Sequence, residues 1–302
     1  MKAATATTAA TVQNRIQLKN IVFATDFSQT ARAAMPFAAE IAQRFGAKLF
    51  AVHAKTPENY ALPTTEIWPI ANAQLEQDTK ELKETLTKQF PKVESEVLTA
   101  EGGVWAVVAA VVQQKQADLI VVGTSGRRGI GKFVLGSVAE EILRRAKCPV
   151  LTVGPHATAD PPREAKFKKI VYATDFGEGC HAAAAFAVAL AEEHQAHLTL
   201  LHVIQEPSAE ALVAEEEIEA AALDRLRALV AGEAELWCEP KAVVRQGVPA
   251  EKILELAKRE EADLIVLGVR NFNGVVRATH FAGAVAHQVV AEAPCPVLTV
   301  RA

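Results

Sequence analysis

The chain contains 302 residues, of which half are apolar and 23% are charged, and its formal net charge is −4 at pH 7. This length is about twice the ~150 residues of an average domain, so we expect two domains with cores that fold without disulfides or metals. The slightly acidic balance argues against a general affinity for nucleic acid, and no apolar run approaches the roughly 20 residues of a membrane helix. Neither nucleic acid nor a membrane is therefore an expected partner.

The N-terminal residues 1–16 are rich in Ala and Thr and lack the apolar segment of a secretory signal, so we expect a disordered tail there. The cysteines of the chain are Cys148, Cys180, Cys238 and Cys295. They show neither a CxxC pair nor the spacing of zinc ligands, which indicates neither a redox pair nor a metal site. A reduced, cytoplasmic chain is the expected setting.

After residue 18, short runs rich in Val, Ile and Leu alternate with longer stretches of helical period. Runs that are apolar on both faces are typical of buried parallel strands covered by helices, so the predicted fold class is α/β. Ser28 is placed to cap a first helix that ends at Gly46, and long helices are expected over Gln74–Phe90 and Ala209–Val230. The strands predicted in the first half are Ile21–Thr25, Lys48–His53, Lys92–Leu98, Leu119–Gly123 and Val150–Val153.

The second half of the chain repeats the first. KNIVFATDFS at Lys19–Ser28 recurs as KKIVYATDFG at Lys168–Gly177, ADLIVVG recurs as ADLIVLG, and both copies close on CPVLTV. We therefore expect domains over residues 17–154 and 167–302, joined by a Pro-rich linker at 155–166. Alternating strands and helices with right-handed crossovers predict a doubly wound, Rossmann-like sheet in each domain. Its ligand crevice lies at the carboxyl ends of the strands, where the strand order reverses.

A glycine-rich loop, GTSGRRGIGKFVLGS, begins at the end of the fourth predicted strand. Its segment GRRGIGK is close to a Walker A motif, but Phe133 stands where that motif needs the Ser or Thr that binds magnesium. A GxGxxG pattern fails because Val134 replaces the third glycine. The spacing G-x2-G-x9-G-S fits at every position. Its residues are Gly123, Gly126, Gly136 and Ser137.

On the TDFS turn, the ADLIVVG strand, this loop spacing and the CPVLTV ending, the chain resembles the universal stress protein family in a tandem two-domain form. The resemblance covers nearly all of the chain after residue 18. It implies five parallel strands per domain with helices on both faces and, in the nucleotide-binding branch, ATP with Mg²⁺ in the crevice. The positions implied at the ribose and adenine are Ala24, Thr25, Asp26 and Ala54, and those implied at the triphosphate are Gly123, Gly126, Gly136, Ser137 and Val138.

The resemblance also implies how the two halves assemble. They are expected to pack around a pseudo-twofold axis, as two chains do in the homodimers of single-domain relatives. Val150–Val153 and Val297–Arg301 are then edge strands, and pairing between the two domains is expected to cover them. A further homodimer and protein partners of unknown identity fit the same scheme.

The chemistry of the loop favours an anion. Glycines let the backbone approach phosphate closely and adopt positive φ, and Ser137 begins a helix whose N–H groups attract negative charge. Arg127 is placed to contact the outer phosphates. Two structural alternatives remain open. Ser137 and Glu140 have the spacing of a capping box, and Asp26 can close its strand as an Asx turn.

The second copy departs from the loop pattern. Asn271 replaces the second glycine, and the next small pair, Gly283–Ala284, comes two residues late and lacks a hydroxyl. We therefore predict that ATP binds only the first domain. The sequence shows no triad order, carboxylate pair or metal-ligand cluster, so the leading hypothesis is a cytoplasmic stress-response protein with ATP as a conformational or assembly ligand. The alternatives are a slow ATPase or autophosphorylating enzyme, and a nucleotide-free interaction module that binds another small ligand.

Overall fold

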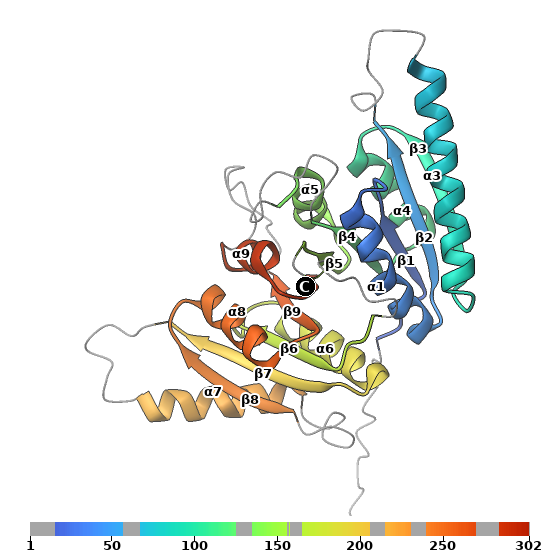
Figure 1. Cartoon of the computed structure of the whole chain (residues 1–302). Helices are drawn as coiled ribbons and strands as arrows, with labels where there is room; N and C mark the ends of the chain where they lie inside the picture. The colour runs from blue at the N-terminus through green and yellow to red at the C-terminus, as the bar shows by residue number, and fades with distance from the viewer. Residues whose placement is uncertain are drawn as a thin grey trace, which may run out of the picture.

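The structure is a computed structural model that describes residues 16–56, 67–124, 135–155, 157, 165–205, 215–230, 240–269 and 284–301. The strands of both halves form one 10-stranded sheet in the order β3-β2-β1-β4-β5-β10-β9-β6-β7-β8. This order reads as one five-strand pattern followed by its mirror sequence, and Figure 1 shows the two halves meeting at β5 and β10 in the middle of the molecule. The predicted α/β class and the doubly wound arrangement in two domains are confirmed.

Within each half all strand pairs are parallel, as the alternation of strands and helices predicts. The elements of the first half are β1 (Asn20–Ala24), α1 (Gln29–Phe45), β2 (Lys48–Lys55), α3 (Ile67–Gln89), β3 (Ser95–Glu101), α4 (Val104–Lys115), β4 (Leu119–Gly123), α5 (Ser137–Arg145) and β5 (Val150–Val153). Those of the second half are β6 (Lys169–Thr174), α6 (Cys180–His194), β7 (His197–Ile204), α7 (Glu215–Val230), β8 (Lys241–Gln246), α8 (Pro249–Glu260), β9 (Leu264–Val269), α9 (Ala284–Glu292) and β10 (Val297–Arg301).

Helices cover both faces of the sheet and bury a separate apolar cluster on each. The cluster on one face joins the strands to α1, α3, α6 and α7, and the cluster on the other joins them to α4, α5, α8 and α9. The first helix has the predicted ends, since Ser28 Oγ accepts the Ala31 N–H at 3.2 Å and Gly46 ends the helix at φ 64°. Because both clusters contain residues of both halves, the two domains share their cores.

The two domains are joined through antiparallel pairing of β5 with β10. Leu151 and Leu298 lie opposite each other at the centre of this pairing. On either side, Thr152 Oγ1 donates to the Val297 carbonyl at 3.1 Å and Thr299 Oγ1 donates to the Val150 carbonyl at 3.2 Å. The reciprocal contacts place a pseudo-twofold axis at the leucine pair. The expectation that these two strands cover each other is confirmed.

The Asp of each ADLIV segment has a structural role at the other end of the sheet. Asp118 Oδ2 accepts the N–H groups of Lys19 and Asn20 at 2.7 and 3.0 Å. Asp263 Oδ2 makes the equivalent contacts, at 2.8 and 2.9 Å, with the two lysines that begin the second repeat. These carboxylates fix the amino ends of neighbouring strands, so the motif serves the fold and does not contribute to a crevice at the carboxyl ends.

Candidate functional site

The strand order reverses between β1 and β4, because β1 lies between β2 and β4 in the sheet. Ala24, the last residue of β1, is in register with Val52 of β2 and Val122 of β4, and the Thr25 N–H donates to the Val52 carbonyl at 2.9 Å. The turn after β1 and Thr124, the residue that follows β4, therefore lie at the same edge of the sheet. This is the place where doubly wound sheets bind ligands.

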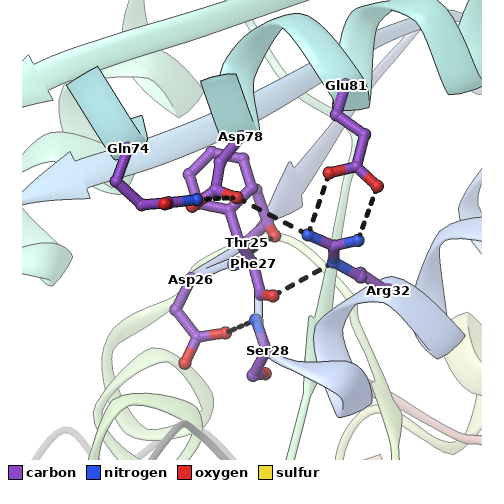
Figure 2. A network of polar contacts seen from close by, with 8 residues as sticks. All are labelled: Thr25, Asp26, Phe27, Ser28, Arg32, Gln74, Asp78 and Glu81. Carbon is purple, nitrogen blue, oxygen red and sulfur yellow. Dashed lines mark hydrogen bonds and ion pairs between the residues drawn. The ribbon is translucent and has the colours of Figure 1, made fainter. Parts of the chain in front are cut away.

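The turn after β1 is held by its own side chains (Figure 2). Thr25 Oγ1 accepts the Phe27 N–H at 3.0 Å, and Asp26 Oδ1 accepts the Ser28 N–H at 2.9 Å. Phe27 has φ 61°, a left-handed conformation that costs about 1 kcal/mol for a residue other than Gly. The half-buried Asp26 carboxylate thus forms the Asx turn that the sequence left open as its structural role.

The second domain forms the same turn. Thr174 Oγ1 accepts the Phe176 N–H at 2.9 Å, Asp175 Oδ1 accepts the Gly177 N–H at 2.8 Å, and Phe176 has φ 56°. Both copies of the repeated sequence therefore form this turn. The turn alone therefore does not distinguish a ligand-binding domain from one without ligand.

His53 supports the turn from β2, and sequence reasoning did not single it out. Its ring is 4% exposed, Nδ1 lies 2.8 Å from the Thr25 carbonyl oxygen, and the ring centroid lies 4.6 Å from that of Phe27. His202 repeats both contacts in the second domain, at 2.8 Å to the Thr174 oxygen and 4.4 Å to the Phe176 ring. The recurrence of His at the same place in both copies was the signal available in the sequence.

Ala54 follows His53 along β2 and so faces the other side of the sheet. It is buried in the same apolar cluster as Ala24, on the face covered by α4 and α5. These two small side chains line the carboxyl edge of β1 and β2, where the resemblance places the base. The structure thus brings Ala24, Thr25, Asp26 and Ala54 to adjacent positions on one edge of the sheet.

Gly123 has a packing role that its sequence motif did not indicate. A Cβ atom there would lie 3.3 Å from the Ala31 nitrogen and the Thr30 carbonyl carbon, which are main-chain atoms of the first turn of α1. The equivalent Gly268 is less crowded, with the Ala183 Cβ at 3.5 Å and the Gly179 oxygen at 3.6 Å. Close approach of β4 to α1 accounts for the glycine without any ligand, so substituting Gly123 does not test phosphate binding.

Gly136 is the N-cap residue of α5, and Ser137 is the first residue within the helix. The capping-box interpretation is therefore wrong, because that motif needs Ser137 at the N-cap and no side chain caps this helix. The Gly136 N–H donates to the Thr124 carbonyl at 2.7 Å, which ties the start of α5 to the end of β4. Gly136 has φ −64° and ψ 143°, so positive φ is not the reason for glycine at this position.

The start of α5 presents exposed groups beside the carboxyl end of β4. The side chains of Ser137 and Val138 are exposed, the latter at 37%. N–H groups in the first turn of a helix have no partner within the helix, and with the helix dipole they favour an anion. Gly126 and Arg127, the remaining predicted contacts, lie outside the described residues.

Among the described residues, no group of three or more His, Cys, Asp or Glu side chains is arranged to hold a metal ion, and no helix is long and apolar enough to cross a membrane. Burial raises the pKa of the Cys148 thiol to about 11 and that of the Cys295 thiol to about 12. Both thiols are therefore protonated near neutral pH, which makes them poor nucleophiles.

Comparison with known proteins gives matches in both halves of the chain. The model of the universal stress protein family matches residues 17–154 and 166–301. A universal stress protein of Methanocaldococcus jannaschii is 33% identical over 140 residues, covering 45% of this chain and 81% of that protein. One of Thermus aquaticus is 41% identical over 139 residues, covering 45% of this chain and 99% of that protein. A crystal structure of a universal stress protein from Archaeoglobus fulgidus shares the fold over 95% of this chain and 99% of its own, with a TM-score of 0.65 at 17% identity.

Proposed function

This chain belongs to the universal stress protein family, and we propose that it is a cytoplasmic stress-response protein whose first domain binds ATP as a conformational or assembly ligand. The observation that carries the proposal is the convergence, at the β1–β4 switch point, of the Thr25–Asp26 turn with the exposed start of α5. One side offers a carboxylate and small side chains for a nucleoside. The other offers helix N–H groups and a hydroxyl for phosphates.

Mg²⁺ is expected to arrive with ATP, held mainly by the phosphates. Mg²⁺ takes oxygen ligands and usually keeps several waters, and the Asp26 carboxylate and Ser137 hydroxyl are the oxygen donors that the described part of this edge supplies. Binding ATP–Mg²⁺ places no demand on a preformed protein cage. The residues present therefore fit a Mg²⁺ ion that obtains most of its ligands from ATP and water.

A single ATP per chain follows from the difference between the two domains. Both keep the Thr–Asp–Phe turn, but α5 begins at Ser137 whereas its counterpart α9 begins at Ala284. Without the hydroxyl and the glycine spacing, the second domain retains only the nucleoside side of the site.

Free thiols at Cys148, Cys180 and Cys295 agree with a reducing compartment.

Saturating ATP with Mg²⁺ is expected to raise the melting temperature of the wild-type chain. A ligand at one hundred times its Kd adds about 2.7 kcal/mol to the free energy of unfolding. Gly136→Val should remove about half of this gain or more, because a branched side chain blocks phosphate from the first turn of α5 while Val adopts the observed φ and ψ without strain. Loss of two hydrogen bonds to a charged group weakens binding by tenfold or more.

Gly103→Val is the matched control. Gly103 is the N-cap of α4 with φ −64° and ψ 142°, almost the dihedral angles of Gly136, and a Cβ atom there has no neighbour within 4 Å. Its variant should bind ATP as the wild type does, with one nucleotide per chain by calorimetry. Two nucleotides per chain, or equal behaviour of Gly136→Val and wild type, would contradict the proposal. Phosphate release in single turnover that depends on Asp26 or Ser137 would favour the enzymatic alternative instead.

The nucleotide-free alternative is tested on the purified chain itself. We expect ATP, or its breakdown products, to be released when the protein is denatured and the supernatant is analysed by mass spectrometry. A different small molecule, recovered from a chain that ATP does not stabilise, would favour an interaction module that binds that ligand.

A further inference from the structure

Arg32, on the first turns of α1, bridges the turn after β1 to the long helix α3. Its Nε donates to the Phe27 carbonyl at 3.2 Å. The two Nη atoms contact the Glu81 carboxylate at 2.9 and 3.4 Å, and Nη2 lies 3.6 Å from Asp78 Oδ1. Gln74 Nε2 in turn donates to Asp78 Oδ1 at 3.2 Å, and Figure 2 shows this chain of contacts running from α3 to the turn.

The bridge acts on the strained residue of the turn. Phe27 lies between Asp26 and Ser28, and its left-handed backbone persists only where its surroundings hold it. The Thr25 hydroxyl accepts its N–H, and the Arg32 guanidinium donates to its carbonyl, so both main-chain polar groups of Phe27 are engaged. The direction of the neighbouring Asp26 carboxylate depends on this conformation.

Folding stability does not explain the Arg32–Glu81 pair. The side chains of Arg32 and Glu81 are 48% and 50% exposed. Exposed ion pairs contribute little to folding because water and salt screen them and ordering two long side chains costs entropy. The bidentate contact with Glu81 holds the Arg32 guanidinium in one orientation. A guanidinium fixed in this way is suited to position the turn after β1, whose Phe27 carbonyl it contacts.

The second domain supports its turn in another way. His181 stands at the sequence position of Arg32. A cation near its turn is Arg225 of α7, whose Cζ lies 4.0 Å from the Phe176 ring centroid. Arg225 approaches the Phe176 ring from α7. Arg32 instead belongs to α1, donates to the Phe27 carbonyl and links it to Glu81 of α3. The bridge is thus a feature of the first domain, the domain with the complete loop motif.

We propose that Arg32 is a positioning residue of the nucleotide site: it fixes the turn that carries Asp26 and couples this turn to α3, so that occupancy of the crevice changes the order of α3. That the ligand is ATP rests on the proposed function. That the turn and α3 are coupled rests on the contacts of Arg32. Carboxylates on α3 hold the guanidinium, and the guanidinium holds the turn. Ligand contacts that tighten the turn therefore tighten α3 as well.

The test compares Arg32→Met and Arg32→Lys with wild type by hydrogen exchange and by ATP calorimetry. In Arg32→Met, the Ser28 amide, which donates to Asp26, should exchange about fivefold faster, and the Kd for ATP should rise about fivefold or more. In Arg32→Lys, the Ser28 exchange rate and the Kd for ATP should lie between those of wild type and Arg32→Met, because lysine keeps the charge but not the bidentate fork. Added ATP should slow exchange along α3 in wild type and not in Arg32→Met.

Two controls lie within the same chain. Arg44→Met removes another arginine of α1, 47% exposed and paired with Glu40 at 2.9 Å, and should leave both readouts unchanged. The Gly177 amide makes the equivalent turn contact in the second domain and should exchange equally in all variants. An unchanged Ser28 amide in Arg32→Met overturns the inference, as does a faster amide with unchanged ATP affinity. If wild type binds no ATP, the proposed function fails, and the exchange of Ser28 still decides whether Arg32 positions the turn.

Discussion

Leu298→Ala should lower the free energy of unfolding of the whole chain by about 3 kcal/mol, the cost of a leucine truncated in a closely packed core. Leu298 is 2% exposed and lies opposite Leu151, itself fully buried, at the centre of the β5–β10 pairing. Its apolar cluster includes residues of both domains. The cavity therefore weakens the junction as well as one domain, and urea unfolding followed by circular dichroism measures the loss.

Ile218→Ala is the control for this substitution, because Ile218 on α7 is 42% exposed. Its removal should change the free energy of unfolding by no more than about 0.5 kcal/mol. Leu151→Ala combined with Leu298→Ala should cost less than the sum of the single variants, since the two side chains fill one space. A loss below 1 kcal/mol for Leu298→Ala would show that the two domains do not depend on each other's packing.

The sequence predicted strands best where both faces of the strand are buried. Leu119–Gly123 and Val150–Val153 have the bounds expected, and both lie inside the sheet. The third strand was expected over Lys92–Leu98 but runs over Ser95–Glu101, at the sheet edge. Val93 lies in the turn that follows α3 and not in the strand; it is buried, and its N–H donates to the Phe90 carbonyl.

The long outer helices were predicted with the right type, and the first of them with the wrong starting point. The helix expected over Gln74–Phe90 begins at Ile67, a full two turns earlier in the chain. The helix expected from Ala209 is described from Glu215, and residues 209–214 belong to a segment outside the described residues. Exposed helices on the outside of the sheet bury one narrow face, so apolar periodicity marks their middle more clearly than their ends.

The candidate site was predictable as far as it depends on local sequence. The resemblance implied Thr25 and Asp26 as site positions, turn chemistry gave the Asx turn of Asp26, and glycine spacing marked the start of α5. His53 and Arg32 were missed because their partners are 28 residues away for the histidine and 49 residues away for the arginine. In the sequence Arg32 is an ordinary polar residue on a helix, and only the packing of α1 against α3 gives it a role.

A second buried polar group lies where the two domains meet on the face covered by α1 and α6. His194, at the end of α6, is 2% exposed, and its Nδ1 lies 3.5 Å from Glu40 Oε1 of α1. The Phe167 ring packs edge-on against it at 5.0 Å. Burial, together with the positive charges of Arg44 and Lys168, lowers the pKa of His194 to about 4. The folded chain therefore keeps this imidazole neutral between pH 4 and its ordinary pKa of 6.5.

The wild-type chain should lose about 2 kcal/mol of its free energy of unfolding, from this group alone, between pH 7 and pH 5. The sign follows from the depressed pKa. In that range the unfolded chain binds a proton at His194 and the folded chain does not, so lowering the pH favours unfolding. His194→Leu removes the group while filling a similar volume, and its stability should fall less over the same interval. Urea unfolding of both proteins at several pH values measures the difference.

Arg44→Met separates charge from burial in this effect. Removing one of the two cations that depress the pKa of His194 should raise that pKa toward its ordinary value, so the loss of stability between pH 7 and pH 5 should shrink without disappearing. Burial, the larger cause, stays in place in that variant. Other groups that titrate are common to wild type and His194→Leu and cancel in that comparison. Equal pH dependence in wild type and His194→Leu would mean that the imidazole is hydrated or protonated at the junction, and hence that α1 and α6 separate there in solution.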